Sequence, residues 1–496
     1  MSRVLFIGVD AADRDLVAAW AEAGHLPTFR RLRESGVTAD VEVPAAFYVG
    51  AVWPSFHTAW SAARHGRYCF KQYRPGSYRA ERVDPDIIPA RSFWQYLDDA
   101  GRKAIVIDVP KSSLAPMRHG IHIVDWGTHD PERAGFVTSP ASLAEEILAR
   151  FGAEPVGNCD RVVRTVGGYR RFARELKRRI DGKLAMTRHF MQSQDWDMLA
   201  VSFGESHCIG HQCWHLHDDG HERHPPGIAR NVGDPVLDIY RMLDSAVASL
   251  IDAAGDDCHV FVLCSHGMGR HYDGGHLMKE ALLRINRKMP FGRSRAEQHA
   301  AYAETGADPA AGVELFVDGL PRPAMTLSFV VPNNDAYLGI RINVVDRELF
   351  GRVRPGEEYE RYRAALMDAL RALTIGEGGP PAFASVQAIE DLYPQRTAGD
   401  ALPDLVAAWS RAAPYRALAS PTIGLIEGEY RGVRSGDHRA GGRLYMTGPA
   451  IAAAKLPPVR TEDIAPTICH LLGVELPDVD GRPIRLVQRG AVAAAQ

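Results

Sequence analysis

The sequence lacks any stretch of about 18 uninterrupted apolar residues, roughly the length that an α-helix needs to cross a bilayer. It also lacks an excess of charge of one sign, because 58 lysines and arginines stand against 61 aspartates and glutamates. The first absence argues against a membrane partner, and the second argues against a nucleic-acid-binding surface. We therefore expect a small-molecule substrate. The sequence leaves the oligomeric state open.

Cysteine is scarce, with seven residues in a chain of 496, and no two of them form a C-x-x-C pair. An odd number of scattered cysteines in a long chain is typical of a reducing compartment. The N-terminal residues MSRVLFIGVDAADRD contain a short apolar run that ends in an acid, which indicates a core strand and not a signal peptide. These features predict a cytoplasmic protein.

Apolar runs and amphipathic helical patterns alternate along most of the chain. The apolar runs predict buried strands at 4–10, 104–110, 197–203 and 259–264. This alternation predicts an α/β fold, a three-layer sandwich around a mostly parallel central sheet. In such a sheet the functional groups gather at the carboxyl ends of the strands.

The segment 290–399 interrupts the alternation, since it is rich in proline and glycine and then gives one strand pattern and one strongly helical stretch. We interpret it as an inserted, cap-like α+β subdomain. The catalytic core would then comprise residues 1–289 and 400–496.

Polar side chains with metal-binding chemistry follow several of the predicted strands. Asp10 ends the first strand, and His207 and His211 lie in the run GESHCIGHQCWHLHD after the third. If this run is helical, the two histidines lie one turn apart on one face and can bind a single ion. His266 ends the fourth strand, and His438 precedes a later apolar segment. Imidazole and carboxylate together favour zinc or a similar first-row ion.

These motifs, taken in order, resemble the alkaline phosphatase superfamily in its type I phosphodiesterase and nucleotide pyrophosphatase branch. VLFIGVDAAD near the N-terminus is similar to that family's first strand and metal-binding aspartate, and SHGMG at 265–269 is similar to its Asp-His-Gly-Met strand end. GDHRAGGRLYMTGPAI (436–451) and EDIAPTICHLLGVELPDVDGRPI (462–484) resemble its last histidine motif and its closing segment. The resemblance spans residues 4–484 and implies an alkaline phosphatase-like fold.

The resemblance also implies two metal ions about 4 Å apart. One site would take His211, His438 and His207, which stands where the family usually has an aspartate. The other site would take Asp10 and His266, together with a position that is usually a second aspartate and is Ser265 here. The Asp10/His266 site is therefore expected to be weak or empty.

The family's threonine or serine nucleophile has no counterpart in the matching stretch around 53-WPSFHTAWSAARHG-66. An ungapped alignment places Val49 at the nucleophile position, whereas an alignment on the Trp-Pro pair places Val52 there. Neither side chain can attack phosphorus. Ser55 is the alternative hydroxyl group.

These departures from the family pattern lead to one mechanistic hypothesis. Three neutral imidazoles on one zinc ion favour lowering the pKa of a bound water toward about 7. The protein would then be a metal-dependent hydrolase of a phosphate or sulfate ester, phosphodiester or phosphonate, using direct attack by metal-bound water and not a covalent intermediate. One tightly bound zinc ion is expected, with manganese or iron possible, and Asp10 and His266 would act as base, orienting groups or ligands of a second ion.

Two further residues, Arg439 and Ser265, are candidates for contact with the anionic substrate. Two alternatives stay open: a noncatalytic relative that binds an anionic ligand, and a transferase or lyase of a specialised biosynthetic pathway. Asp10, His211, His266 and His438 are all retained, and the family's aspartate is replaced by another ligand-type residue, His207. This pattern favours an active enzyme over a relative that has lost its activity.

Overall fold

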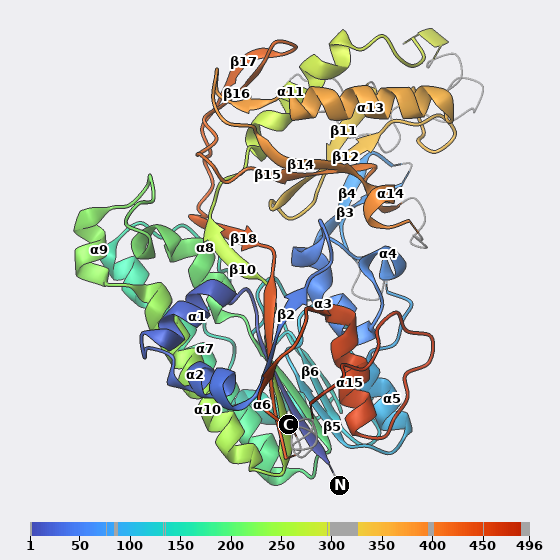
Figure 1. The fold of residues 1–496 in the computed structure, drawn as a ribbon. Helices are drawn as coiled ribbons and strands as arrows, with labels where there is room; N and C mark the ends of the chain where they lie inside the picture. The colour runs from blue at the N-terminus through green and yellow to red at the C-terminus, as the bar shows by residue number, and fades with distance from the viewer. Residues whose placement is uncertain are drawn as a thin grey trace, which may run out of the picture.

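The computed structural model describes residues 2–75, 77–83, 88–131, 133, 135–294, 296–297, 326–394, 401–449 and 451–487. A larger lobe is built on a ten-stranded sheet, and a smaller lobe lies above the upper edge of that sheet (Figure 1). In chain order the strands of the large sheet are β1 (Arg3–Val9), β2 (Val37–Glu42), β5 (Ala104–Ile107), β6 (Ile121–Val124), β7 (Val137–Ser139), β8 (Met198–Phe203), β9 (Cys258–Cys264), β19 (Gly442–Thr447), β20 (Ala454–Lys455) and β21 (Val459–Arg460).

The central strands of the large sheet run parallel and end at the same level. The order is β20-β2-β19-β9-β1-β8-β5-β6-β7, with β21 also paired to β2. Strand β1 is parallel to both β8 and β9, and its Val9 pairs with Phe203 on one side and Cys264 on the other. Strand β19 is antiparallel to its neighbours, as is β7 to β6. The predicted mostly parallel sheet is therefore confirmed.

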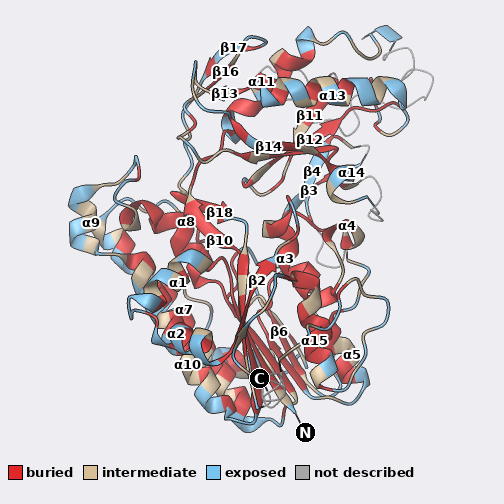
Figure 2. Cartoon of the chain, viewed as in Figure 1, coloured by how far each residue is buried: buried red, intermediate tan, exposed pale blue. Residues whose placement is uncertain are grey.

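Side chains alternate between the two faces of the sheet, and each face supports its own core. On β1, Leu5, Ile7 and Val9 enter one core, whereas Val4 and Phe6 enter the other. The first core packs under α1 (Arg14–Glu22), α2 (Pro27–Ser35), α6 (Leu143–Phe151), α7 (Val166–Ser193), α8 (Glu205–His217) and α10 (Pro235–Ala254). The second packs under α3 (Tyr48–Thr58), α5 (Phe93–Asp99) and α15 (Ile464–Leu471). Figure 2 shows the buried strands between these helices, which confirms the three-layer sandwich.

A short two-stranded antiparallel sheet stands at the carboxyl end of the large one. It pairs β10 (Gly267–Arg270), which directly follows β9, with β18 (Gly436–Arg439). In this register Met268 faces His438. This pairing places His438, the histidine of the last motif, near His266 at the end of β9.

The smaller lobe contains a four-stranded antiparallel sheet in the order β11-β12-β15-β14 and a three-stranded sheet in the order β13-β16-β17. Its elements are α11 (Gly275–Lys288), β11 (Ser328–Val331), β12 (Tyr337–Ile342), α13 (Glu357–Arg371), β13 (Thr374–Ile375), β14 (Phe383–Ala388), β15 (Leu405–Trp409), β16 (Ala417–Ser420) and β17 (Gly424–Glu427). These elements share one core, which includes Leu277 and Leu405 from outside the predicted segment 290–399. The boundaries at 289 and 399 stay a prediction, and residues 295, 298–325 and 395–400 of that segment lie outside the described residues.

Cys159 and Cys208 form a disulfide between the loop before α7 and the helix α8. The two cysteines are 49 residues apart, so their spacing in the sequence gives no sign of the pairing. The predicted reducing compartment stays a prediction. Within the described ranges, no helix combines the length and the apolar character that spanning a bilayer requires.

Three buried histidines outside the candidate site predict a loss of stability in mild acid. Burial lowers the pKa of His57, His65 and His122 from 6.5 to about 3. As the pH falls below about 6.5, each of these histidines takes up a proton in the unfolded chain but not in the folded chain. Between pH 6.5 and about pH 3, each histidine should therefore lower the free energy of unfolding by about 1.4 kcal/mol for every unit by which the pH falls. Urea unfolding at about pH 5.5 and about pH 4.5, both between the two pKa values, measures this slope.

The variant His122→Gln provides the control, because Nδ1 of His122 accepts the Ala115 amide and a glutamine oxygen can accept the same bond without titrating. The slope in this variant should fall by about 1.4 kcal/mol per pH unit. An unchanged slope would contradict the assignment for this histidine.

Candidate metal centre

Asp10 lies at the end of β1, where its carboxylate accepts hydrogen bonds from three side chains. Oδ1 accepts from Trp53 Nε1 at 2.7 Å and from Ser265 Oγ at 2.9 Å, and Oδ2 lies 2.7 Å from Nδ1 of His207. Burial by itself would raise the pKa of Asp10, but the contacts with His207, His266 and Trp53 lower it below its ordinary value. Asp10 is therefore a fixed anion at neutral pH.

Helix α8 carries two histidines whose Nε2 atoms face each other. Nε2 of His207 lies 3.0 Å from Nε2 of His211. The Nδ1 of His207 is bonded to Asp10, and the Nδ1 of His211 donates to the Gly436 carbonyl at 2.8 Å. These acceptors place the proton on Nδ1 of each neutral ring, so that two lone pairs point at each other. Two facing lone pairs repel each other unless a proton or a cation lies between them.

The first turn of α8 is held by a buried ion pair. Glu205 accepts from Arg179 Nε of α7 at 2.6 Å, and both side chains are fully buried. Arg179 also pairs with Glu154. This pair fixes α8 against α7, and it therefore fixes the direction in which His207 and His211 point.

His266 and His438 complete the group of imidazoles. Nε2 of His266 lies 3.0 Å from Nδ1 of His438, and the His438 ring centroid lies 4.6 Å from those of both His207 and His211. Nδ1 of His266 lies 3.0 Å from Ser265 Oγ. The structure therefore brings together all five ligands that the sequence predicts, and His207, His211 and His438 are called the histidine cluster below.

All four histidines are neutral in the folded protein. Burial lowers the pKa of His207 to about 4 and that of His266 to about 3. Burial also lowers the pKa of His211 and of His438 well below the ordinary value, with further contributions from neighbouring cationic groups. Neutral imidazole is the form that binds a metal, so the site is prepared for a cation without first losing protons.

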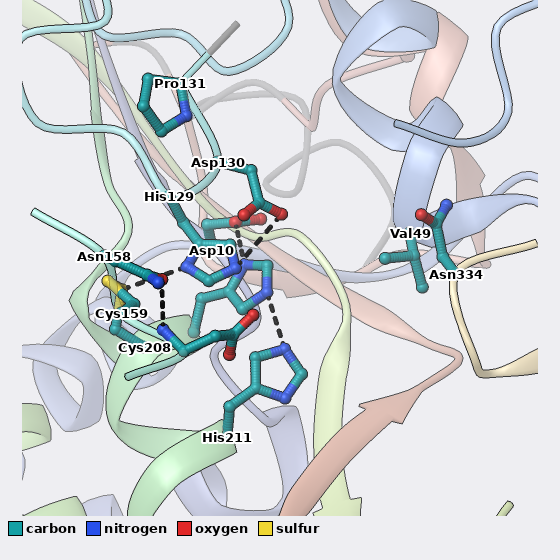
Figure 3. A network of polar contacts seen from close by, with 12 residues as sticks. Asp10, Val49, His129, Asp130, Pro131, Asn158, Cys159, Cys208, His211 and Asn334 are labelled. Carbon is teal, nitrogen blue, oxygen red and sulfur yellow. Dashed lines mark hydrogen bonds and ion pairs between the residues drawn. A yellow bond between two sulfur atoms is a disulfide. The ribbon is translucent and has the colours of Figure 1, made fainter. Parts of the chain in front are cut away.

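A cavity of ≈ 40 Å³ opens beside the histidine cluster. The residues that line it include Asp10, His207 and His438, and also Val49 from the start of α3. Figure 3 shows Val49 and Asn334 on one side and Asp10, His129 and His211 on the other. The cationic side chains in the lining are Lys111 and Arg434.

The two predicted substrate-contact residues, Ser265 and Arg439, do not line this cavity. Ser265 is fully buried, and its hydroxyl is used by Asp10, by His266 and by the amide of Ala11. Arg439 is 47% exposed, and Nη1 lies 3.9 Å from Asp13. Their contact with substrate stays a prediction, and the geometry favours the cations that line the cavity.

His129 belongs to the site and was missed from the sequence. Its ring centroid lies 3.9 Å from that of His207, and one nitrogen each of His129, His207 and His211 fall within 4.8 Å of one another. Nε2 of His129 also lies 3.3 Å from an oxygen of Asp130. Both residues occur in DWGTHDP directly after β6, so the rule that polar residues gather after strands identifies them once β6 is recognised.

The donor set fits a first-row divalent cation. Neutral imidazoles converge from α8 and β18, and the outer nitrogens of His207 and His211 are held by acceptors, which is the usual environment of a metal-binding histidine. Several groups of described His, Cys and Asp residues here have ligand atoms within 4.8 Å of one another. The buried residues of this site could therefore hold a metal ion.

Comparison with known proteins gives a family match and a fold match. Residues 4–413 match the family model described as type I phosphodiesterase / nucleotide pyrophosphatase. The structure is similar to phosphonoacetate hydrolase from Sinorhizobium meliloti 1021, in its complex with phosphonoacetate (13% identity, TM-score 0.52, 95% of each chain covered) and in its complex with phosphonoformate (14%, 0.51, 95% of each chain). Human ectonucleotide pyrophosphatase / phosphodiesterase 5 gives 12% identity and a TM-score of 0.49 over 97% of each chain. No curated protein shows a significant match.

The fold and the family match together define a member of a hydrolase family of phosphodiesterases and pyrophosphatases. The chain belongs to the type I phosphodiesterase / nucleotide pyrophosphatase family of the alkaline phosphatase superfamily, since the match covers well over half of its length. The family is typically metal-dependent. The structural similarity to phosphonoacetate hydrolase confirms the predicted alkaline phosphatase-like fold. His438 lies beyond the matched segment, and its place in the site comes from the β10–β18 pairing.

Proposed function

We propose that this protein is a zinc-dependent hydrolase of a phosphate or sulfate ester, phosphodiester or phosphonate, in which water attacks directly and no covalent serine or threonine intermediate forms. The observation that carries the proposal is that His207 and His438, which pack on His211, line a cavity to which the start of α3 contributes Val49. Manganese or iron would also suit this donor set.

The position of the missing nucleophile is best assigned to Val49. Val49 lines the cavity, whereas Val52 is fully buried in the core of the second sheet face. Ser55 is also fully buried, and its Oγ lies 3.1 Å from Nε2 of His65. Nδ1 of His65 accepts the Arg67 amide, so Nε2 carries the proton and donates to Ser55. A histidine in this tautomer cannot remove the serine proton, which argues against Ser55 as a nucleophile.

When bound in the histidine cluster, zinc would supply Lewis acidity and lower the pKa of a coordinated water. Asp10 holds His207 in the tautomer that presents Nε2, and its lowered pKa makes it a weak base at neutral pH. We therefore assign Asp10 and His266 to orientation of the imidazoles. A second ion at Asp10 and His266 would lack the usual second aspartate, because Ser265 stands there, so we propose that this second site is weak or empty.

Substrate recognition is assigned to the cations of the cavity. Nζ of Lys111 donates to the Val49 carbonyl at 2.7 Å, and it lines the same cavity as Asp10. Burial lowers the pKa of Lys111 to about 8, so the ammonium group is mostly protonated at neutral pH. Arg434 is held by both oxygens of Asp160, at 3.1 and 2.6 Å. The lining also contains Asp10, Asp130 and Asp335, so an anionic substrate would need the charge of a bound metal ion in addition to these two cations.

Hydrolysis of a substrate panel with and without chelator tests the proposal. The panel contains bis-p-nitrophenyl phosphate, p-nitrophenyl phosphate, p-nitrophenyl sulfate and an aryl phenylphosphonate. We expect turnover of at least one ester, its loss with chelator and its recovery with zinc. Absence of chelator-sensitive turnover on every substrate would overturn the hydrolase and favour a protein that only binds an anionic ligand.

Metal analysis of variants tests where the ion lies. The number of ions per chain should fall by one in His211→Ala and should be unchanged in His266→Ala. Loss of an ion in His266→Ala, with the histidine cluster still loaded, would show that the Asp10/His266 site is filled and would contradict the one-ion assignment.

A further inference from the structure

A second group of metal-binding side chains lies outside the histidine cluster. It consists of His271 and Asp273, in the turn between β10 and α11, and Asp437 on β18, and it is called the Asp273 cluster below. The three residues are 6%, 9% and 2% exposed, respectively. One ligand atom from each falls within 4.8 Å of the other two.

Each member of the Asp273 cluster is held in place by a second contact. Oδ1 of Asp273 accepts the Gly275 amide at 2.8 Å, which leaves Oδ2 at 2.8 Å from Nε2 of His271. Oδ1 of Asp437 accepts the His438 amide at 2.8 Å. The His271 ring packs on Tyr430, with the ring centroids 4.1 Å apart. The donor atoms are therefore positioned before any ligand arrives.

The two carboxyl groups of the Asp273 cluster have few cationic partners. Among the described residues, no lysine or arginine forms an ion pair with Asp273 or Asp437, and His271 alone pairs with Asp273. Arg411 and Arg434 are close enough to interact electrostatically with Asp437, but their hydrogen bonds go to other groups. Arg411 donates to the carbonyls of Arg270 and His438, and Arg434 donates to Asp160.

We propose that the Asp273 cluster is a second cation site, which binds a divalent first-row ion such as Mn²⁺ or Zn²⁺ through His271 Nε2, Asp273 Oδ2 and a carboxylate oxygen of Asp437. One imidazole and two carboxylates are a donor set that these ions accept, and two acids compensate the charge of the ion. A cavity of ≈ 280 Å³ reaches His271 and Asp273 and gives the ion a path from solvent.

An ion in the Asp273 cluster would connect the turn before α11 to the strand that carries His438. Asp437 precedes His438 on β18, and one of its oxygens also lies within 4.8 Å of ligand atoms of His211 and His438. The second site therefore adjoins the histidine cluster but shares none of the three imidazoles of that cluster. Its effect would be to fix β18 relative to the smaller lobe.

Metal stoichiometry of full-length variants tests this site separately from the histidine cluster. Each protein is loaded with Mn²⁺ or Zn²⁺, passed through a desalting column and analysed for bound ions per chain. Asp273→Asn should bind one ion fewer than the parent protein and keep its chelator-sensitive turnover. The matched control is Glu222→Gln, an acid that lines the same cavity outside the cluster, which should bind as many ions as the parent.

The variant His211→Ala gives a second readout that does not depend on how Asp273→Asn folds. It keeps the Asp273 cluster, so it should retain one ion, and the double variant His211→Ala/Asp273→Asn should lose that ion. If the histidine cluster binds no metal, the parent and His211→Ala would each hold one ion and only the proposed function would fail. The second site would be overturned if His211→Ala holds no ion, or if Asp273→Asn binds as many ions per chain as the parent protein.

Discussion

Replacement of His211 by alanine is expected to lower chelator-sensitive hydrolysis by more than about 100-fold and to remove the ion of the histidine cluster. Substitution of residues that merely support a metal ligand costs about 10- to 100-fold, and His211 would be a ligand itself. Its Nε2 faces that of His207 at 3.0 Å, and its other nitrogen is held by the Gly436 carbonyl. Turnover and bound metal are measured on the same preparation.

The control for this prediction is His215→Ala, one turn further along α8. His215 is also buried, but it contacts Tyr169 and lines a different cavity. Its replacement removes an imidazole from the same helix without touching the histidine cluster, so metal content and turnover should stay close to those of the parent. Equal losses in the two variants would mean that the effect of His211→Ala is a general effect on α8.

Asp10→Asn is expected to lower metal affinity by about 10- to 100-fold and to lower turnover at least as much. The Asp10 carboxylate accepts from Trp53, Ser265 and His207, and every one of these partners donates. Asparagine offers one accepting oxygen and one NH₂ group, so at least one partner would face a donor. If that partner is His207, the ring loses the contact that keeps its proton on Nδ1. Zinc titration and steady-state kinetics measure both effects.

Asp13→Asn is the matched control, because Asp13 lies three residues further along the same segment and caps α1. Its Oδ1 accepts the amides of Asp15 and Leu16, and asparagine caps helices about as well as aspartate. Oδ2 accepts the Met268 amide at 3.2 Å, so the variant also measures the loss of one weak hydrogen bond to β10. This variant should keep its metal and its activity. A loss in Asp10→Asn no larger than that in Asp13→Asn would contradict the role assigned to Asp10.

The core of the fold and four of the five metal-ligand candidates, Asp10, His207, His211 and His266, could be predicted because local patterns specify them. The apolar run of β1 ends at Asp10, and a helix after β8 places His207 and His211 one turn apart. His438 could be predicted only through the family resemblance, because its approach to His266 depends on the pairing of two short strands that are far apart in the chain.

Which cationic side chains line the cavity could not be predicted in the same way, since side-chain direction decides this. Successive residues of a strand point to opposite sides, and Arg439, the residue after His438 on β18, points away from the histidine cluster. Arg439 accordingly lies near Asp13, and Arg434, in the loop before β18, lines the cavity. His129 was missed because β6 is only four residues long and gives little strand signal.

The extent of the smaller lobe also depends on long-range pairing. The apolar segment at β15 predicts a strand, but its sequence does not say which sheet it joins. In the structure β15 lies between β12 and β14 of the smaller lobe, although residue 405 falls beyond the predicted boundary at 399. Strand neighbours of this kind follow from tertiary packing and not from local pattern.

The stereochemical course at phosphorus tests the central claim most directly. A phosphorothioate diester of known configuration is hydrolysed in ¹⁸O-labelled water, and the configuration of the product is determined. Direct in-line attack by water is a single displacement and predicts inversion. Retention of configuration would require two displacements through a covalent intermediate, and it would contradict the assignment of Val49 to the place of the nucleophile.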